Sequence, residues 1–173
     1  MSSFSSDRRP VTALWVFALL LILGVGAVGG GIALIFGVGG ENMLPDAYLD
    51  DLPLVTSWVV PGLILGVGFG LGSLITAYGV WRRPRWAWAQ RLVAFTRYHW
   101  AWLATLLLGV GHVAWITIEL VSIPFSWLMP TFGLVGLALS LLPLTPSFRT
   151  YLVESPPESV STPPRTHSAP VAH

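Results

Sequence analysis

The sequence predicts an all-α membrane protein, a four-transmembrane-helix bundle with both termini cytoplasmic and a disordered C-terminal tail. Three observations support this prediction. The 173 residues are 54% hydrophobic and 10% charged, with a mean hydropathy of +0.71, a balance that is typical of multi-pass membrane proteins and rare in soluble domains. Four apolar runs approach or exceed the length that crosses a bilayer. The arginines gather in alternate connections between these runs, which predicts their orientation.

Composition also excludes several classes of function. The chain has no cysteine, which rules out disulfide relays, thiolate nucleophiles and iron–sulfur ligation. Its net charge of +1 provides no general attraction for nucleic acid, so we expect no nucleic-acid partner. All nine basic residues are arginine. Together with the many glycines, alanines and prolines, this indicates a GC-rich genome and favours an actinobacterial origin.

Residues 1–10 form a predicted cytoplasmic head, and the first span follows over about residues 11–38. No small-residue cleavage motif separates the two, and the apolar run is nearly twice the length of about 7–15 residues found in a signal peptide. We therefore expect a retained helix. Gly26 and Gly30 lie four residues apart in it, a spacing that lets another helix approach closely in lipid.

The connection after the first span is acidic. It contains Glu41, Asp46, Asp50 and Asp51 and no basic residue. Carboxylates of this kind bind hard cations such as calcium, but their spacing here fits no ligand-loop pattern. We favour a solvated acidic loop, with a cation site as the alternative.

The second span is predicted over about residues 57–80, with Gly62, Gly66 and Gly70 as packing positions. An interfacial turn and a short amphipathic helix then lead to the third span. Here arginines alternate with tryptophans, so guanidinium groups can contact anionic lipid headgroups while indole rings lie at headgroup depth. This lipid-interface belt comprises Arg82, Arg83, Arg85, Trp86, Trp88, Arg91 and Arg97.

The third and fourth spans are predicted over about residues 98–123 and 126–144, joined by a tight turn, with Gly109 and Gly133 as further packing positions. The transmembrane domain would thus cover 11–144. Residues 145–173 are rich in Pro, Ser and Thr and predict a disordered tail. Arg8, Arg9, the belt and Arg149 all fall on one predicted side, which we assign to the cytoplasm of a multi-pass protein of the plasma (inner) membrane.

Ionisable groups within an apolar run occur in the third span alone. Tyr98, Thr105, His112 and Glu119 are seven residues apart, so a helix places them on one face with a drift of about 20° per repeat. Intramembrane ionisable residues are costly and are functional candidates. One hypothesis is a water-linked path that moves protons or a small cation. The structural alternative makes Tyr98 an interface anchor, bonds Thr105 to its own helix backbone, and bonds His112 and Glu119 to a neighbouring helix.

The stretch from Leu108 to Arg149 carries a recognisable pattern. Its residues are Trp115, Ile116, Glu119, Pro124, Ser126, Trp127, Leu128, Gly133 and Gly136, and a closing LLPL-x-PS before Arg149. In these residues the chain resembles a family of small, uncharacterised four-span integral membrane proteins of actinobacteria. The resemblance implies topology and origin, and the family has no established activity to transfer.

No residue set in the chain predicts catalysis or a metal site. A serine–histidine hydrolase needs an orienting acid, and a histidine zinc site needs three or four ligands. We therefore expect no enzyme, no metal and no cofactor. The favoured hypothesis is an accessory or assembly component, packed as a homo-oligomer or within a larger membrane complex. The alternatives are the proton or small-cation relay and, as a minor one, a haem-binding dimer using His112 of each subunit, because His99 and His112 of one helix cannot ligate the same iron.

Overall fold

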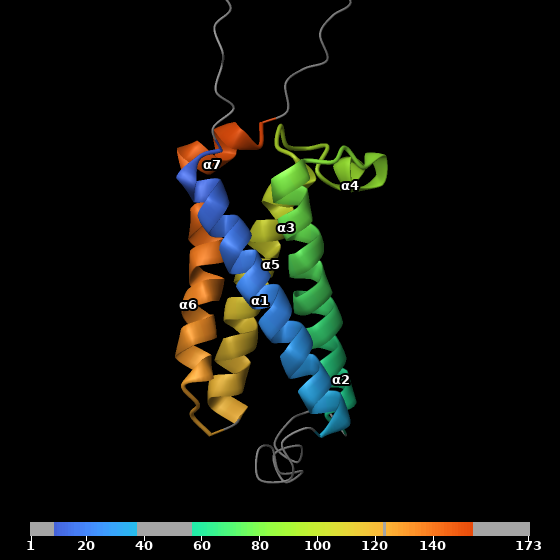
Figure 1. Ribbon diagram of the computed structural model, residues 1–173, viewed down its shortest axis with the longest axis vertical. Helices are drawn as coiled ribbons and strands as arrows, with labels where there is room; N and C mark the ends of the chain where they lie inside the picture. The colour runs from blue at the N-terminus through green and yellow to red at the C-terminus, as the bar shows by residue number, and fades with distance from the viewer. Residues whose placement is uncertain (1–8, 38–56, 123, 154–173) are drawn as a thin grey trace, which may run out of the picture.

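The computed structural model describes residues 9–37, 57–122 and 124–153, and these are largely helical (Figure 1). Three helices are long and apolar enough to cross a membrane, and a fourth apolar helix is shorter. Within the described residues the extended backbone is limited to one isolated bridge, Tyr98 with Val153. The predicted all-helical class and its membrane-compatible helices are thus confirmed. The acidic residues from Glu41 to Asp51 and the part of the predicted tail beyond Val153 lie outside the described residues. The prediction of disorder is wrong for the start of the tail, because residues Pro146–Tyr151 form a helix whose Phe148 is fully buried.

The first long helix, α1 (Val11–Phe36), has clear physical limits at both ends. Pro10 precedes it with an extended backbone at ψ 147°. The helix ends at Gly37, whose φ of 62° lies in the left-handed region and whose N–H donates to the carbonyl of Ala33. Glycine adopts this conformation without a steric penalty from Cβ, so the position is a natural helix end.

The second long helix is continuous from Val59 to Arg82 but changes its winding along the way. It consists of α2 (Val59–Leu63), the π-helix η2 (Ile64–Leu71) and α3 (Gly72–Arg82). It ends at Arg83, whose φ of 50° is left-handed, and whose N–H donates to the carbonyl of Gly79 at 2.9 Å. Pro84 follows directly and disfavours helical backbone before it.

The third long helix, α5 (Trp100–Ser122), follows the short helix α4 (Ala87–Leu92). It begins two residues later than the predicted span, because Tyr98 pairs with Val153 and side chains satisfy the first free N–H groups. Gln90 Oε1 accepts a hydrogen bond from the N–H of Trp100, and His99 Nδ1 accepts one from the N–H of Ala101, each at 3.3 Å.

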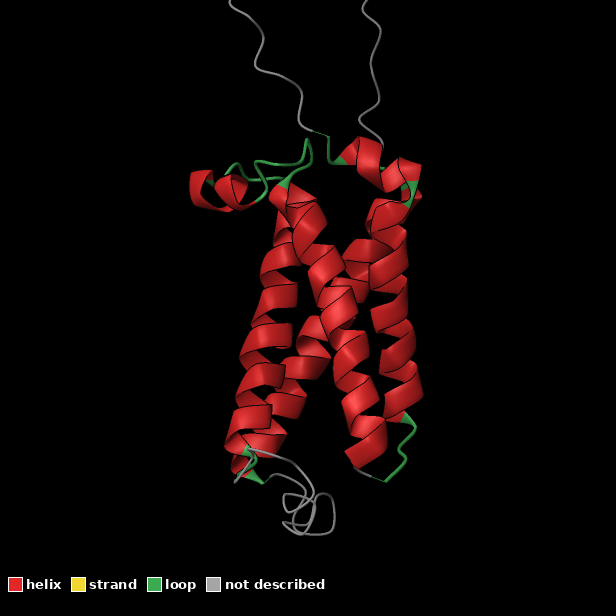
Figure 2. Cartoon of the chain, turned by 180° about the vertical axis from the view of Figure 1, so that it is seen from behind, coloured by secondary structure: helices red, strands yellow, loops and turns green. Residues whose placement is uncertain are grey.

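The last part of the chain contains α6 (Leu128–Leu141), η3 (Leu142–Leu144), a 3-10 helix, and α7 (Pro146–Tyr151). The indole N–H of Trp102 donates to the carbonyl of Pro143 at 2.8 Å and ties α5 to η3. Figures 1 and 2 show α4 and α7 lying across the same end of the long helices. We call this the arginine end, because the described arginines lie in or beside the elements that meet there; the opposite end, with the α5–α6 turn, is the hairpin end.

Close helix contacts depend on glycine. A Cβ added at Gly31 of α1 would lie 2.6 Å from the carbonyl oxygen of Gly62, and one added at Gly109 of α5 would lie 2.5 Å from the backbone nitrogen of Ser140. A Cβ at any of the seven predicted packing glycines would lie within 4 Å of another helix. These are Gly26, Gly30, Gly62, Gly66, Gly70, Gly109 and Gly133.

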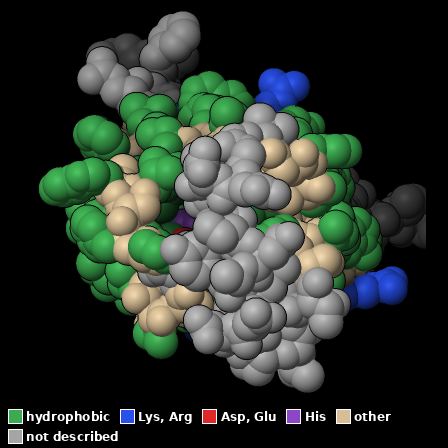
Figure 3. Space-filling view, turned by 90° about the horizontal axis from the view of Figure 1, so that it is seen from below, with side chains coloured by type: hydrophobic (Ala, Val, Ile, Leu, Met, Phe, Trp, Pro, Cys, Tyr) green, Lys and Arg blue, Asp and Glu red, His purple; other side chains and the backbone are tan. Residues whose placement is uncertain are grey.

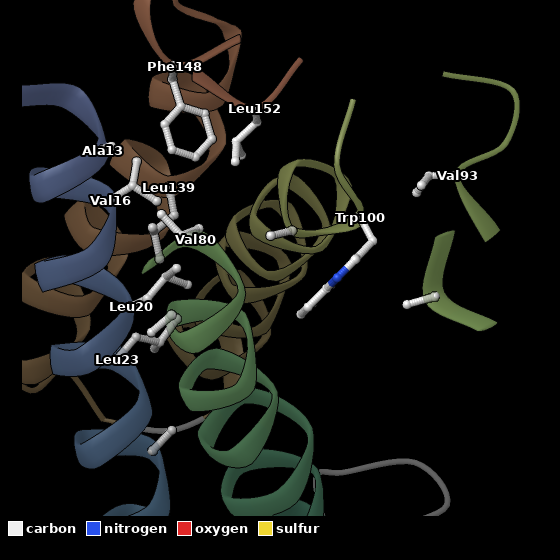
Figure 4. Close-up of a cluster of buried hydrophobic side chains, with 14 residues drawn as sticks. Ala13, Val16, Leu20, Leu23, Val80, Val93, Trp100, Leu139, Phe148 and Leu152 are labelled. Atoms are coloured by element: carbon white, nitrogen blue, oxygen red, sulfur yellow. The ribbon is translucent and has the colours of Figure 1, made fainter. Parts of the chain in front are cut away.

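The filled hydrophobic core lies towards the arginine end (Figure 4). Side chains of α1, α3, α6 and α7 meet there, with Phe148 and Leu139 fully buried and Leu152 at 1% exposure. Two hydrogen bonds hold the ends of elements in place: Tyr151 Oη donates to the carbonyl of Val80 at 3.2 Å, and Thr12 Oγ1 donates to Ser147 Oγ at 3.1 Å. The arginine end is therefore closed by side-chain packing as well as by polar contacts.

Candidate functional site

A cavity of about 160 Å³ lies between α1, η2, α5 and α6, in the half of the molecule nearer the hairpin end. We call it the internal cavity. Figure 3, viewed from the hairpin end, shows histidine and acidic side chains in a recess among apolar ones. The internal cavity is lined by Leu23, Gly26, Ala27, Gly30, Leu65, His112, Trp115, Ile116, Glu119, Leu128, Met129 and Phe132.

Two of the predicted packing glycines lie in the wall of this cavity. A Cβ added at Gly26 would lie 2.7 Å from the ring of Phe132, and one added at Gly30 would lie 3.0 Å from Leu65. All four residues line the internal cavity. The absence of side chains on α1 at these positions therefore lets Phe132 and Leu65 pack closely against it at the cavity wall.

Glu119 is the single acidic residue among those that the structure describes. Its Oε1 accepts a hydrogen bond from the indole N–H of Trp115 at 2.7 Å, one helical turn earlier. Trp115 in turn lies beside Phe69, with ring centroids 6.0 Å apart. The carboxylate is therefore held in place at the cavity wall, and it keeps further lone pairs for another donor.

His112 lies two turns before Glu119 and is 2% exposed. Neither ring nitrogen has a hydrogen-bond partner within the described part of the chain. Its nearest ring neighbours are apolar: Phe69 with centroids 5.2 Å apart and Phe132 at 6.2 Å, both edge-on. A buried polar group without a partner costs about 1–3 kcal/mol, so an imidazole in this place needs an explanation.

The structure divides the predicted polar stripe. His112 and Glu119 share the internal cavity, whereas Thr105 and Tyr98 are not among its lining residues. Thr105 is buried and donates to the carbonyl of Ala101 in its own helix at 2.7 Å. Between the two pairs, Gly109 brings the backbone of α5 against that of α6.

The structural alternative for these residues needs two corrections. His112 was expected to bond to a neighbouring helix, but neither of its ring nitrogens has a hydrogen-bond partner within the described residues. Glu119 was expected to bond to a neighbouring helix, but its partner Trp115 belongs to the same helix, because an indole four residues earlier lies on the same face. Tyr98 lies just before α5 and packs against Trp102, with ring centroids 4.8 Å apart. It therefore belongs to the arginine end rather than to the helix that holds His112.

The predicted lipid-interface belt lies at the arginine end. Trp86 stacks between Tyr78, Trp88 and Trp100, at centroid distances of 6.2, 6.0 and 5.1 Å. Trp88 is 66% exposed. Arg91 and Arg97 are also exposed. Aromatic stacking thus holds the indole of Trp86 against the protein, whereas the indole of Trp88 lies at the surface.

A second cavity, of about 370 Å³, opens at this end between Arg82, Arg83, Arg85, His99, Tyr151, Leu152 and Val153. Arg83 Nη1 donates to the carbonyl of Tyr151 at 3.4 Å, and its guanidinium carbon lies 4.7 Å from the centre of that ring. At the start of α1, Arg9 lies 3.6 Å over the ring of Trp81. Arg83 at this cavity and Arg9 at the start of α1 are thus each held against an aromatic ring.

The two histidines proposed or considered for haem lie in different places. His99 precedes α5, and its Nε2 lies 2.9 Å from the carbonyl of Pro84 at the arginine end. His112 lies in the internal cavity. Among the described residues there is no group of three or more His, Cys, Asp or Glu side chains that could hold a metal ion.

Sequence reasoning missed the aromatic side chains of the site. The spacing of four residues between Trp115 and Glu119 is a helical contact signal and could have identified Trp115. Phe132 comes from another helix and gave no such signal. Its place in the site depends on how α6 packs against α1 and α5.

The chain matches no protein-family model, and searches of curated proteins and of solved structures found no significant match. The resemblance to actinobacterial four-span proteins stays a prediction. The function must therefore be argued from the chemistry of the site.

Proposed function

We propose that this chain is a non-enzymatic multi-pass protein of the plasma membrane whose internal cavity binds a small solute. The observation that carries the proposal is that His112 and Glu119 line one otherwise apolar cavity. Small-molecule sites have this composition: mostly apolar walls with a few convergent polar groups. A water-filled or ligand-filled space also explains why an unpaired imidazole is tolerated in this half.

Four spans with the arginine end in the cytoplasm form part of this proposal. The clustering of Arg82, Arg83, Arg85, Arg91 and Arg97 near the exposed indole of Trp88 supports it, since arginines favour the cytoplasmic side and indoles favour the interface. The apolar segment Leu128–Leu144 is short for a membrane span. Tilt of the neighbouring helices or local thinning of the bilayer can accommodate it. The internal cavity would then be reached from outside the cell.

The proposal keeps part of the relay hypothesis. His112 and Glu119 remain as polar groups that a proton or small cation could visit. Thr105 and Tyr98 are left out, because Thr105 is bonded to its own helix and Tyr98 lies before α5. Binding from one side is therefore favoured over a continuous path along the stripe.

Blocking the mouth of the internal cavity tests this proposal. Leu128 lines the cavity and is 59% exposed, so Leu128→Trp adds bulk at its edge with little cost to folding. Leu134 of the same helix is 68% exposed and is not among the lining residues, so Leu134→Trp is the matched control. A panel of small apolar, cationic and anionic solutes is screened by thermal stabilisation of the purified protein, since a ligand that binds the folded state raises the melting temperature.

We expect at least one solute to stabilise the wild type and Leu134→Trp but not Leu128→Trp. The proposal fails if no solute stabilises the wild type, or if Leu128→Trp responds as the wild type does.

An accessory or assembly role is the second proposal. It is favoured by Gly29 and Gly68, which are exposed and where an added Cβ would meet nothing within 4 Å, so another helix could approach closely there. Purification in mild detergent tests it. A defined oligomer or a co-purifying membrane complex that is lost in Gly29→Leu or Gly68→Leu supports this role, and a strictly monomeric protein without partners contradicts it.

A further inference from the structure

We infer that the solute bound in the internal cavity is a small organic cation, with an ammonium group at Glu119 and a single ring or short apolar body against the aromatic wall. This inference rests on the proposed function and names its ligand class. It is carried by the charges of the four helices that enclose the cavity, by the position of Glu119 and by the size and composition of the walls.

The charge argument follows from the sequences of the enclosing elements. Helices α1, η2, α5 and α6 contain no Lys or Arg, and Glu119 is their single carboxylate. A carboxyl group in an apolar site stays ionised only beside a positive partner, because its desolvation is otherwise uncompensated and the group takes up a proton. The enclosing helices supply only His112, two turns away. A cation brought by the ligand provides the missing charge.

The position of Glu119 suits a donor from the cavity. Trp115 already donates to Oε1 at 2.7 Å, which fixes the carboxylate on the wall. The carboxylate has room for further donors, since its two oxygens offer about four lone-pair directions. A bond from an ammonium N–H to a carboxylate is roughly twice as strong as one between neutral groups. The site is therefore preorganised for an amine rather than for a hydroxyl.

The walls select an organic cation over a metal ion. Calcium takes about 6–8 oxygen ligands, whereas the lining residues provide one carboxylate among apolar and aromatic side chains. Trp115 and Phe132 offer ring faces and edges for an apolar body, and an indole also attracts a cation within about 6 Å. The apolar carbon atoms of an organic cation can be buried against these rings. An inorganic ion has no carbon to bury and gains nothing from such burial.

Size restricts the ligand further. The internal cavity has a volume of about 160 Å³. A protein cavity of about 150 Å³ lined by apolar residues accommodates benzene. One aromatic ring therefore nearly fills the internal cavity, with a short ammonium arm extending from it. Larger amphiphiles, including lipids, would have to leave most of their chain outside.

Three probes of nearly equal shape test the ligand class on the purified full-length protein in nanodiscs: benzylammonium, benzyl alcohol and benzoate. Binding is measured by isothermal titration calorimetry at fixed ionic strength. We expect benzylammonium to bind at least tenfold more tightly than benzyl alcohol, and benzoate to bind more weakly than both. Glu119→Gln should weaken benzylammonium binding at least tenfold and change benzyl alcohol binding less than twofold. Glu119→Asp, which keeps the charge, should retain the preference for the cation.

The outcomes separate this inference from the proposed function. If benzylammonium and benzyl alcohol bind the wild type equally, and Leu128→Trp abolishes both, the cavity is a ligand site but the ligand class is wrong. If potassium ions displace benzylammonium at equal concentration, the site is inorganic and the inference is overturned. If no probe binds the wild type, or if Leu128→Trp binds them unchanged, the proposed function fails as well. The comparison of probes on the wild type needs no variant, so it holds even if Glu119→Gln does not fold.

Discussion

The two halves of this molecule are built on different principles. Towards the arginine end, bulky side chains such as Phe148, Leu139 and Leu152 fill the space between the helices, and Tyr151 is hydrogen-bonded to Val80, while the second cavity opens among polar side chains beside this core. Towards the hairpin end, backbones touch at Gly31 and Gly62, while a cavity remains beside them. Filled packing stabilises one half, and close backbone contact encloses space in the other.

The filled half near the arginine end contributes mainly to stability, whereas the half near the hairpin end holds the candidate functional site. A helix pair that touches through glycine needs no side chain at the contact. At the neighbouring positions Gly26 and Gly30, the glycines let Phe132 and Leu65 approach α1 closely at the cavity wall. The polar groups of α5 follow this division: Thr105 is bonded to its own helix, and His112 lines the internal cavity.

The largest effect on stability is expected from truncating a large buried side chain in the filled half near the arginine end. Phe148 is fully buried among α1, α6 and α7. Phe148→Ala should lower the free energy of unfolding by about 3–5 kcal/mol, because lost contacts and a new void add to each other. Leu65→Ala, on the wall of a cavity that already exists, should cost less than half of that. Thermal denaturation in detergent measures both, and equal costs would contradict the contrast between the halves.

The next effect concerns the backbone contact in the hairpin half. Gly31→Ala would place a methyl group 2.6 Å from the carbonyl oxygen of Gly62 and should destabilise the protein by about 2 kcal/mol, within the usual range for overpacking. Gly29→Ala is the control, because an added Cβ there meets nothing within 4 Å. A Gly31→Ala protein as stable as Gly29→Ala would show that α1 and η2 are not held in this close contact.

A smaller effect, of opposite sign, is expected at His112. His112→Phe removes two buried nitrogens that have no partner among the described residues and keeps a ring among Phe69 and Phe132, so it should stabilise the folded protein by about 1 kcal/mol. Thr105→Val removes a hydroxyl that is hydrogen-bonded and should destabilise it slightly. Melting temperatures of the two variants that shift in the same direction would count against this explanation.

The sequence was sufficient for the three long helices and for the residues that face one another along a single helix, but it missed α7, which lies in the predicted disordered tail. Apolar run length identified the three long helices, and the heptad spacing placed His112 and Glu119 on one side of α5. The sequence was insufficient where the structure depends on contacts between segments that lie far apart in the chain. The start of α5 depends on the pairing of Tyr98 with Val153, and the site includes Phe132 from α6. No local pattern encodes such contacts.

The smallest effect is expected at the end of α3, and it tests how the arginine end is held together. Arg83 combines a left-handed φ of 50° with contacts to Tyr151. A side chain in this conformation costs about 1 kcal/mol relative to glycine, whereas the contacts favour arginine. Arg83→Ala keeps the backbone penalty and loses the contacts, so it should be less stable than the wild type. Arg83→Gly loses both and should lie within about 0.5 kcal/mol of the wild type. If Arg83→Gly were no more stable than Arg83→Ala in thermal denaturation, the contacts with Tyr151 alone, and not the backbone, would determine the stability of this helix end.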